Sequence, residues 1–431
     1  MITESLPQRE SVTAPVDTAK PLRWIVAQEG SRQTYAIPLA FNRLGNLRLF
    51  YADIWCRHGR SLLRRFSAGG RALAGRYRAE IPEDRVVSFN FRGAVFQSIR
   101  HFRRGRQTAA ELGEAHCRLG RWFAHRIRDH LRRVDLDPSR DVFFGFDTSS
   151  LEVLELLKER RVFTILDQVD AGIVHEDMVI EETKLWPGWQ TFPDRMPQRY
   201  WDRRKAEWEL ADLVLVNSEW SRQATIKQGV RADKIVVVPL AIDLSHESLP
   251  PPIEAAGRLQ VLWLGNVLIS KGIQYLVEAA RLLQDREIDF LLAGPVGIDG
   301  IVVRDFPANI KILGRVTRDQ LSSVYRRAHV FVLPTISDGF AVTQLEAMAH
   351  GLPVVITPNC GRVVTDGKDG LVVPVRDGKA LAGALARLDS DRDLVREMSV
   401  NALATIRNYD LPSNARLICD ITRRERSRLG F

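Results

Sequence analysis

The sequence predicts an α/β protein made of two facing Rossmann-like, doubly wound domains with a cleft between them. The chain has 431 residues, which is too long for one ordinary core and suits two domains of about 200 residues each. Short apolar runs alternate with segments of helical apolar spacing in both halves. A stretch with several prolines, 239–252, interrupts this alternation, and we interpret it as a linker.

Composition limits the class of protein. Hydrophobic residues make up 45% of the chain and aromatics 8%, as in a soluble globular protein. We find no signal-peptide pattern and no apolar run of about 18 residues, so we expect a cytoplasmic protein without a membrane-spanning segment. The four cysteines lie far apart without metal spacing, which predicts reduced thiols. Residues 1–20 are expected to form a disordered leader.

The net charge of +9 is unevenly placed. Between Cys56 and Val134 there are nineteen Arg and no Lys, against six acids. Such an excess is most often a solvated basic face, but it also attracts anionic lipid head groups or nucleic acid. Because no nucleic-acid-binding motif accompanies the arginines, we expect no nucleic-acid partner. An anionic membrane surface at the inner face of the cell membrane stays open as a partner.

The first domain is expected over residues 21–245. Strands are predicted at 22–27, 86–89, 142–146, 162–166 and 213–216, and helices at 35–55, 111–134, 151–160 and 218–229. Ser149 or Ser150 is expected to cap the helix at 151–160. Polar residues follow two of these strands, namely Gly30, Arg32, Asp167 and Asp170. Because ligands bind at the carboxyl edge of open parallel sheets, these residues are candidates for one side of a ligand site.

The second domain is expected over 246–411, followed by a basic helix at 412–431 that packs back toward the first domain. Strands are predicted at 259–264, 290–293, 310–313, 330–333 and 354–356, and helices at 273–283, 318–328 and 343–350. Four glycines, Gly265, Gly294, Gly314 and Gly339, fall at the carboxyl ends of these strands. We therefore expect the four glycines to converge on one edge of the sheet.

The stretch 330–357, VFVLPTISDGFAVTQLEAMAHGLPVVIT, reads as strand, loop, helix and strand. Its helix start favours an anion, because the first N–H groups and the helix dipole point there. Asp338 lies just before that helix and Glu346 inside it, and carboxylates accept hydrogen bonds from sugar hydroxyls. An anion site flanked by sugar-facing acids suggests a sugar nucleotide. Lys271, at the start of another helix, could reach its diphosphate, although many surface lysines occupy such positions.

From about residue 211 to 398 the chain resembles the retaining, nucleotide-sugar-dependent glycosyltransferases of family four (glycosyl transferases group 1), which have the two-Rossmann GT-B fold. The resemblance runs through ADLVLVNSEWSRQATIKQGVRADKIVVVPLAID, LGNVLISKG, IKILGRV, DGFAVTQLEAMAHGLPVVIT and GRVVTDGKDGLVVPVRD. The paired-acid signature of that family stands here as Asp338-x7-Glu346. The first half resembles the family only in its layout, as is usual for the acceptor-binding side. The resemblance therefore places Gly30, Arg32 and Asp170 on the acceptor side, and Asp167 among the catalytic residues with Lys271, Asp338 and Glu346.

The resemblance implies a role for each matching residue. Glu346 would bind the ribose, Asp338 the donor sugar, Lys271 the diphosphate, and Val316 the base through its backbone. Further donor contacts are implied at Gly294 and at the backbone N–H groups of Gly339, Phe340, Ala341 and Val342. Asn266 stands where the family has an arginine, for which Arg315 could substitute, and Asp167 stands where many relatives have a histidine.

These residues predict a hexosyltransferase that uses a nucleotide-diphosphate sugar as donor substrate and needs no other cofactor. The expected acceptor is a glycan or a lipid-linked glycan, in cell-surface polysaccharide or glycolipid biosynthesis. No metal site is expected, because the Asp-x-Asp at Asp135 and Asp137 lies away from any strand end. Two alternatives stay open: a sugar-nucleotide epimerase of two-Rossmann fold, and a catalytically weak sugar-nucleotide-binding protein. His175 is expected to be solvated.

Overall fold

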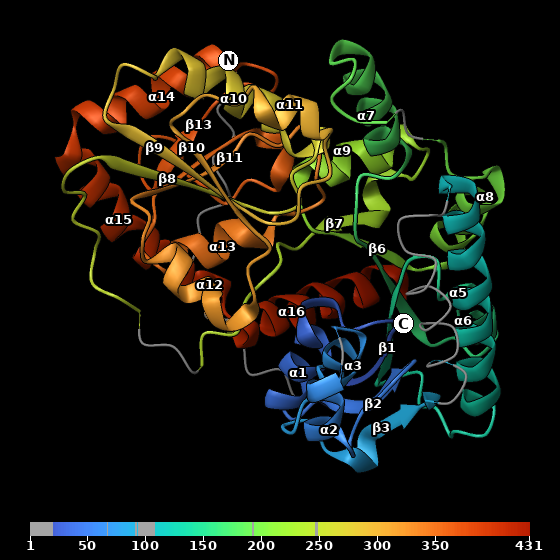
Figure 1. Ribbon diagram of the computed structural model, residues 1–431. Helices are drawn as coiled ribbons and strands as arrows, with labels where there is room; N and C mark the ends of the chain where they lie inside the picture. Colours follow the sequence, from blue (N-terminus) through green and yellow to red (C-terminus); the bar gives the residue numbers. More distant parts are fainter. Residues whose placement is uncertain (1–19, 67, 91–92, 94–107, 192–193, 246–248) are drawn as a thin grey trace.

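The computed structural model describes residues 20–431 apart from 67, 91–92, 94–107, 192–193 and 246–248. This part of the chain forms two parallel sheets, each covered by helices, as the sequence predicts (Figure 1). The leader expected at 1–20 lies outside the described residues, apart from Lys20. Among the helices of the described part, none combines the length and the apolar character that crossing a membrane requires.

The first sheet has seven parallel strands in the order β3-β2-β1-β4-β5-β6-β7. Its strands are β1 (Arg23–Gln28), β2 (Leu47–Ala52), β3 (Val86–Ser88), β4 (Asp141–Phe146), β5 (Phe163–Gln168), β6 (Leu213–Val216) and β7 (Ile235–Val237). Its helices are α1 (Ala36–Arg43), α2 (Arg60–Phe66), α3 (Ala68–Ala74), α5 (Ala109–Leu131), α6 (Leu151–Glu159), α8 (Gln198–Leu210) and α9 (Glu219–Lys227). The strands predicted in this half are therefore confirmed within a residue or two.

The helix predicted at 35–55 is wrong. Helix α1 ends at Arg43, and the chain then turns through Gly45 into β2, which pairs with β1. Gly45 has φ +73°, a conformation that glycine adopts without strain and that commonly ends helices. The apolar residues of β2 also fit a helical spacing, and periodicity alone does not separate the two over so short a run.

The cap predicted for α6 is also different. Ser150 occupies the N-cap position, but the hydroxyls of Ser149 and Ser150 both donate to the Phe146 carbonyl. The carboxylate of Glu207, from α8, instead accepts the backbone N–H groups of Ser150 at 2.9 Å and Leu151 at 3.0 Å. A buried acid from another helix therefore satisfies the free N–H groups at this helix start.

The second sheet has six parallel strands in the order β10-β9-β8-β11-β12-β13. They are β8 (Leu259–Leu264), β9 (Ile288–Ala293), β10 (Ile310–Gly314), β11 (Val330–Leu333), β12 (Val354–Ile356) and β13 (Gly370–Val372). Its helices are α10 (Ile273–Leu282), α11 (Gly300–Arg304), α12 (Arg318–Tyr325), α13 (Val342–Ala349), α14 (Gly378–Ser390) and α15 (Arg392–Ile406). Each element that the sequence predicts here is present.

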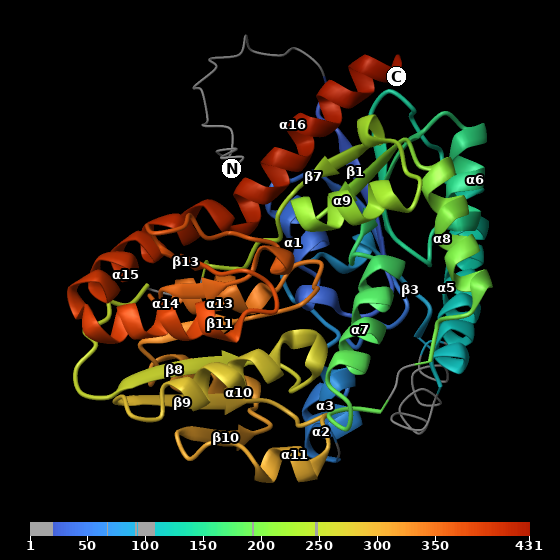
Figure 2. The same cartoon turned by 90° about the horizontal axis from the view of Figure 1, so that it is seen from above.

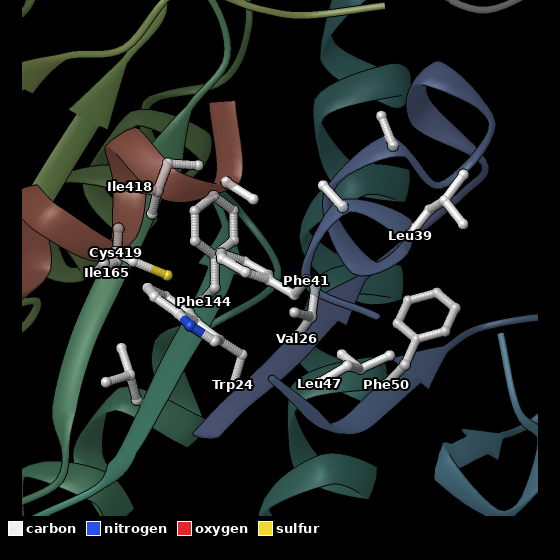
Figure 3. Packing of buried hydrophobic residues seen from close by; sticks show 14 of the residues in the cluster. Trp24, Val26, Leu39, Phe41, Leu47, Phe50, Phe144, Ile165, Ile418 and Cys419 are labelled. Atoms are coloured by element: carbon white, nitrogen blue, oxygen red, sulfur yellow. The ribbon is translucent and has the colours of Figure 1, made fainter. Parts of the chain in front are cut away.

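The last helix, α16 (Leu411–Leu429), leaves the second sheet and packs on the first (Figures 1 and 2). Its residues Ile418 and Cys419 join the core in which Trp24 stacks on Phe41 at 4.0 Å between ring centroids (Figure 3). Because these apolar side chains leave water together, α16 contributes to the stability of the first domain.

The chain passes between the two sheets twice, and the passages run side by side. Ile242 in the linker forms a parallel bridge with Asp410, just before α16, and donates its N–H to the Tyr409 carbonyl at 2.9 Å. Asn414 donates its side-chain amide to the Pro239 carbonyl at 2.8 Å. Two hydrogen-bonded segments therefore join the domains.

Helix α7 (Ile173–Leu185) follows β5 in the chain but packs against the second domain (Figure 1). Its fully buried Glu182 pairs with Arg376 at 2.7 Å and accepts from Tyr275 at 2.6 Å and from Gln274 at 2.8 Å. Trp189, just after α7, packs on the core of the second domain. A segment of the first half is thus fixed to the second at the junction of the two sheets.

Candidate functional site

Lys271 and Asp338 meet at the carboxyl edge of the second sheet. Lys271 ends a short 3-10 helix between β8 and α10, and Asp338 lies in the loop between β11 and α13. Their side chains form an ion pair, each about a quarter exposed. Gly272 makes this approach possible, because it has φ +73° and a Cβ there would lie 1.7 Å from the Pro334 carbonyl oxygen. The structure therefore brings together two residues that sequence reasoning placed on one diphosphate sugar.

Glu346 lies on α13 and is held by a residue that the sequence analysis missed. The Tyr325 hydroxyl donates to Glu346 Oε2 at 2.8 Å. The Tyr325 ring is buried and stacks on His350 at 4.7 Å, and burial followed by the Glu346 charge raises the pKa of Tyr325 well above its usual value. A phenol that stays protonated is a permanent donor, so one oxygen of Glu346 is fixed by the protein.

The loop and helix start after Asp338 offer backbone N–H groups to a ligand, with one exception. Ala341 donates its N–H to the Cys360 carbonyl at 2.9 Å. The resemblance implies that the Ala341 N–H contacts the donor substrate. In this conformation it cannot, because that N–H is already bonded to the Cys360 carbonyl. Gly339, Phe340 and Val342 stay candidates for donor binding, and α13 begins at Val342.

The remaining predicted donor residues also lie at this edge. Gly294 has φ +143°, and a Cβ there would lie 1.7 Å from the Gly265 carbonyl oxygen, so only glycine fits. Gly294 donates its N–H to the Gly314 carbonyl at 2.7 Å, which aligns three strand ends. The side chains of Asn266 and Arg315 are exposed beside them, and Val316 is half-buried. Of the four strand-end glycines, Gly265, Gly294 and Gly314 meet at this edge as expected, whereas Gly339 lies in the loop after β11, against the first domain.

The carboxyl edge of the first sheet holds a buried charge cluster. Arg204 on α8 pairs with Asp147, which follows β4, at 2.9 Å and with Asp170, which follows β5, at 2.7 Å. Arg204 and Asp147 are almost fully buried, whereas half of the Asp170 side chain is exposed. Burial raises the pKa of Asp147 against the opposing charge of Arg204. Burial acts in the same direction on Asp170, but Arg204 and the Gly172 N–H outweigh it and lower the pKa of Asp170.

Asp167 belongs to the same edge and lies near the end of β5. It is 5% exposed, and its Oδ1 is buried without a hydrogen-bond partner among the described residues. Burial raises its pKa to about 7; the Asp147 charge also raises it, and the Arg32 guanidinium opposes both. Gly30 donates its N–H to Asp53 Oδ1 at 3.0 Å, which fixes the loop that leads to Arg32. The predicted acceptor-side residues thus lie on one edge.

His175, in the first turn of α7, is not the solvated residue that the sequence suggested. Burial lowers its pKa, Lys271 adds to that effect, and Asp170 and Asp338 oppose it. His175 therefore faces both sheet edges. The one sign of this placement in the sequence is that His175 follows soon after a strand end. The docking of α7 on the second domain is not visible in the sequence.

A search of the described residues finds no group of three or more His, Cys, Asp or Glu side chains placed to hold a metal ion. The Asp-x-Asp motif has a structural role instead. Asp137 accepts from the Ser139 N–H at 3.0 Å and from its hydroxyl at 2.6 Å, and so shapes the turn before β4.

Residues 258–391, which include Lys271, Asp338 and Glu346, match the family model of the glycosyl transferases group 1. The chain is 31% identical over 222 residues to the D-inositol 3-phosphate glycosyltransferase of Nocardia farcinica, covering 45% of this chain and 48% of that protein. It is 30% identical over 202 residues to the putative colanic acid biosynthesis glycosyltransferase WcaL of Escherichia coli, covering 42% and 49%. The chain spans about half the length of these curated relatives.

Solved structures show the fold over nearly the whole chain. The sucrose-phosphate synthase of Thermosynechococcus elongatus superposes with a TM-score of 0.60 at 16% identity, covering 94% of this chain and 98% of that one. HepE of Anabaena, solved in complex with UDP and glucose, superposes with a TM-score of 0.57 at 15% identity, covering 93% and 99%. The predicted architecture of two facing doubly wound domains is confirmed.

Proposed function

We propose that the protein is a family-four retaining hexosyltransferase that moves a sugar from a nucleotide-diphosphate sugar to an acceptor hydroxyl. The observation that carries the proposal is the arrangement of Lys271, Asp338 and Glu346 on one sheet edge inside the matched domain. A cation for a diphosphate, a helix start and two acids for hydroxyl groups together fit a sugar nucleotide. The relatives that share this region are glycosyltransferases, which supports the same class.

The chemistry follows from these positions. Lys271 would exchange Asp338 for the donor diphosphate, and with the α13 N-terminus it would stabilise the charge that develops as the bond to the sugar breaks. The released Asp338 would accept from the donor sugar, and the free oxygen of Glu346 from the ribose. The acceptor hydroxyl would attack the sugar from the face that the diphosphate leaves, and would pass its proton to the departing phosphate oxygen. No side-chain nucleophile is required.

On the opposite edge, Gly30, Arg32, Asp167 and Asp170 would receive the acceptor. Asp167 stands where a histidine is usual in the family, and a carboxyl group there can orient a hydroxyl. We propose a glycan or lipid-linked glycan as acceptor, in the synthesis of cell-surface polysaccharide or glycolipid.

A screen of nucleotide sugars tests the proposal by nucleotide release, with and without candidate acceptors. The wild type is expected to turn over one donor, and Glu346→Ala to reduce the rate by about a hundredfold or more, as for the loss of a group that holds the reacting parts in place. Glu397→Ala, at an exposed position on α15, is the matched control. Near-normal turnover by Glu346→Ala overturns the assignment, and donor binding without turnover across the panel identifies a binding protein instead.

We further propose that the arginine-rich surface binds anionic lipid at the cytoplasmic face of a membrane. On α5 the exposed arginines are Arg118, Arg121 and Arg126, and Arg132 and Arg133 follow it. Liposome flotation with and without acidic lipid tests this idea. Recovery that rises with acidic lipid and falls with added salt is expected, because such attraction is screened by ions. Equal recovery on neutral liposomes contradicts it.

A further inference from the structure

The loop that carries Asp338 is bound directly by the first domain. The Ser218 hydroxyl lies 2.7 Å from the carbonyl oxygen of Gly339, and the Ser221 hydroxyl lies 3.4 Å from it. Trp220 donates its indole N–H to the Ser337 hydroxyl at 3.2 Å. Contacts from the turn between β6 and α9 therefore reach residues on both sides of Asp338.

The local structure assigns the proton that each hydroxyl donates. Ser218 is the N-cap of α9, and its oxygen accepts the Ser221 N–H at 3.0 Å. The Ser221 hydroxyl lies 3.0 Å from Asn217 Oδ1, closer than to Gly339. Each hydroxyl has one proton, and the shorter contact decides where it goes. Ser221 therefore donates to Asn217, and Ser218 donates to Gly339 rather than to the Ser221 hydroxyl, which lies 3.1 Å away. Both serines are buried, so this bond between the domains forms away from water.

The approach is close enough to require glycine at position 339. A Cβ on Gly339 would lie 2.2 Å from the carbonyl oxygen of Val169, in the loop after β5. Asn217 fixes that carbonyl by donating its side-chain amide at 2.7 Å. Asn217 thus ties the Val169 carbonyl to the same turn that holds Gly339, and the backbone of the second domain fits against both.

We propose that Ser218 is a positioning residue that couples domain closure to the conformation of the Asp338 loop. Its hydroxyl holds the Gly339 carbonyl only while the two sheet edges are together, so the loop is complete only in the closed protein. The inference rests on the proposed function, in which this loop contacts the donor sugar. In that setting closure also keeps water from the reacting sugar. Without the Ser218 bond, a larger share of the donor would therefore be transferred to water.

Three substitutions separate this role from the capping of α9. Ser218→Ala loses both the cap and the bond to Gly339. Ser218→Asp keeps a good N-cap, because its carboxylate still accepts the Ser221 N–H, but it has no proton to donate to a carbonyl. Ser218→Thr keeps both functions. Ser427→Ala, at an exposed position on α16, is the matched control.

Amide hydrogen exchange of residues 333–345 tests the bond itself, whatever the protein transfers. Exchange is expected to rise by about fivefold in Ser218→Ala and Ser218→Asp, as for the loss of one hydrogen bond, and to stay at the wild-type rate in Ser218→Thr and Ser427→Ala. Thermal stability should fall in Ser218→Ala and in Ser218→Asp, which both lose the bond to Gly339, and should change little in Ser218→Thr and Ser427→Ala. Faster exchange in Ser218→Ala without any change in Ser218→Asp would assign Ser218 to capping only and overturn the proposal.

The partition of the donor between hydrolysis and transfer tests the consequence. With the donor found for the wild type, the ratio of hydrolysis to transfer is expected to rise about fivefold in Ser218→Asp and to return to the wild-type ratio in Ser218→Thr. An unchanged ratio in Ser218→Asp overturns the coupling while the proposed function stands. A wild type that releases nucleotide from no donor refutes the proposed function, and the exchange experiment still decides whether the bond exists.

Discussion

The two sheet edges that meet at Gly339 hold their charges in opposite environments. On the second edge, Lys271 and Asp338 each keep about a quarter of the side chain in contact with solvent. On the first edge, the side chains of Arg204 and Asp147 are 1% and 5% exposed. A partly exposed ion pair can exchange one partner for a ligand at lower cost, whereas a buried one is expensive to break. The comparison indicates that the charges of the second edge can exchange partners when a ligand binds, whereas the charges of the first edge hold the structure around the site in place.

The largest expected effect lies on the second edge. Lys271→Ala should reduce kcat/KM for the donor by about a thousandfold, the scale observed when a group that stabilises developing charge is removed. The loss in folding stability should be smaller than the loss in activity, because both side chains of this pair keep contact with solvent. Lys379→Ala, exposed on α14, is the control in the same assay. Turnover by Lys271→Ala within a few-fold of the wild type would contradict a role of the second edge in binding the donor diphosphate.

The next effect lies on the first edge and concerns stability. Arg204→Met should lower the free energy of unfolding by about 3 kcal/mol, because it leaves Asp147 as a buried carboxylate without its partner. Asp170 contributes less, since half of its side chain is exposed. Arg231→Met breaks the surface pair with Asp233, whose side chains are 77% and 52% exposed, and should cost less than about 1 kcal/mol. Urea unfolding of both variants at pH 7 makes the measurement, and equal losses would show that burial does not set how much an ion pair contributes to stability.

The difference between the edges also decides what the sequence could predict. On the second edge, the strands, the helix starts and the acids follow one another within short segments, so local pattern placed Lys271, Asp338 and Glu346 correctly on one sheet edge. On the first edge, Asp147 follows β4 in a turn, and nothing in the local sequence marks it as part of a buried charge cluster. Its partner Arg204 lies in a charged helix with several other arginines and acids, and nothing local marks that arginine as buried.

Contacts between distant segments account for the remaining differences. Tyr325 lies 21 positions before Glu346, and its hydroxyl reaches that carboxylate because α12 and α13 lie on the same face of the sheet. The placement of His175 and the bond from Ser218 to Gly339 depend on how the domains dock. A periodic pattern in one segment carries no information about such docking.

A third effect sharpens the comparison through pH. Burial raises the pKa of Asp167 to about 7, whereas an unfolded aspartate titrates near 4. The folded protein therefore binds one more proton between these values, so the contribution of Asp167 to stability is complete below about pH 4 and is lost as pH rises to about 7. The slope is at most about 1.4 kcal/mol per pH unit. Asp167→Asn has no proton to lose, so its unfolding free energy minus that of the wild type should rise by about 3 kcal/mol from pH 4 to 7 and then level off.

Urea unfolding of both proteins at pH 4, 5, 6, 7 and 8 checks this prediction. Burial also raises the pKa of Glu207 to about 7, but that carboxyl is present in both proteins and cancels in the difference. A difference that stays constant across the range would mean that Asp167 is ionised in the folded state throughout. The first edge would then resemble the second.

The smallest expected effect concerns Tyr325 and Glu346, because in this pair a buried side chain holds a partly exposed one. Tyr325→Phe keeps the ring that stacks on His350 but removes the hydroxyl that donates to Glu346 Oε2. The loss of one hydrogen bond to a carboxylate should raise KM for the donor by about fivefold, with a smaller change in kcat. If the hydroxyl acts by aiming Glu346 at the ribose, a 2′,3′-dideoxy donor should show almost no difference between Tyr325→Phe and the wild type. An equal rise in KM for both donors would instead mean that Tyr325 supports the helix packing, and that the second edge, like the first, depends on buried geometry.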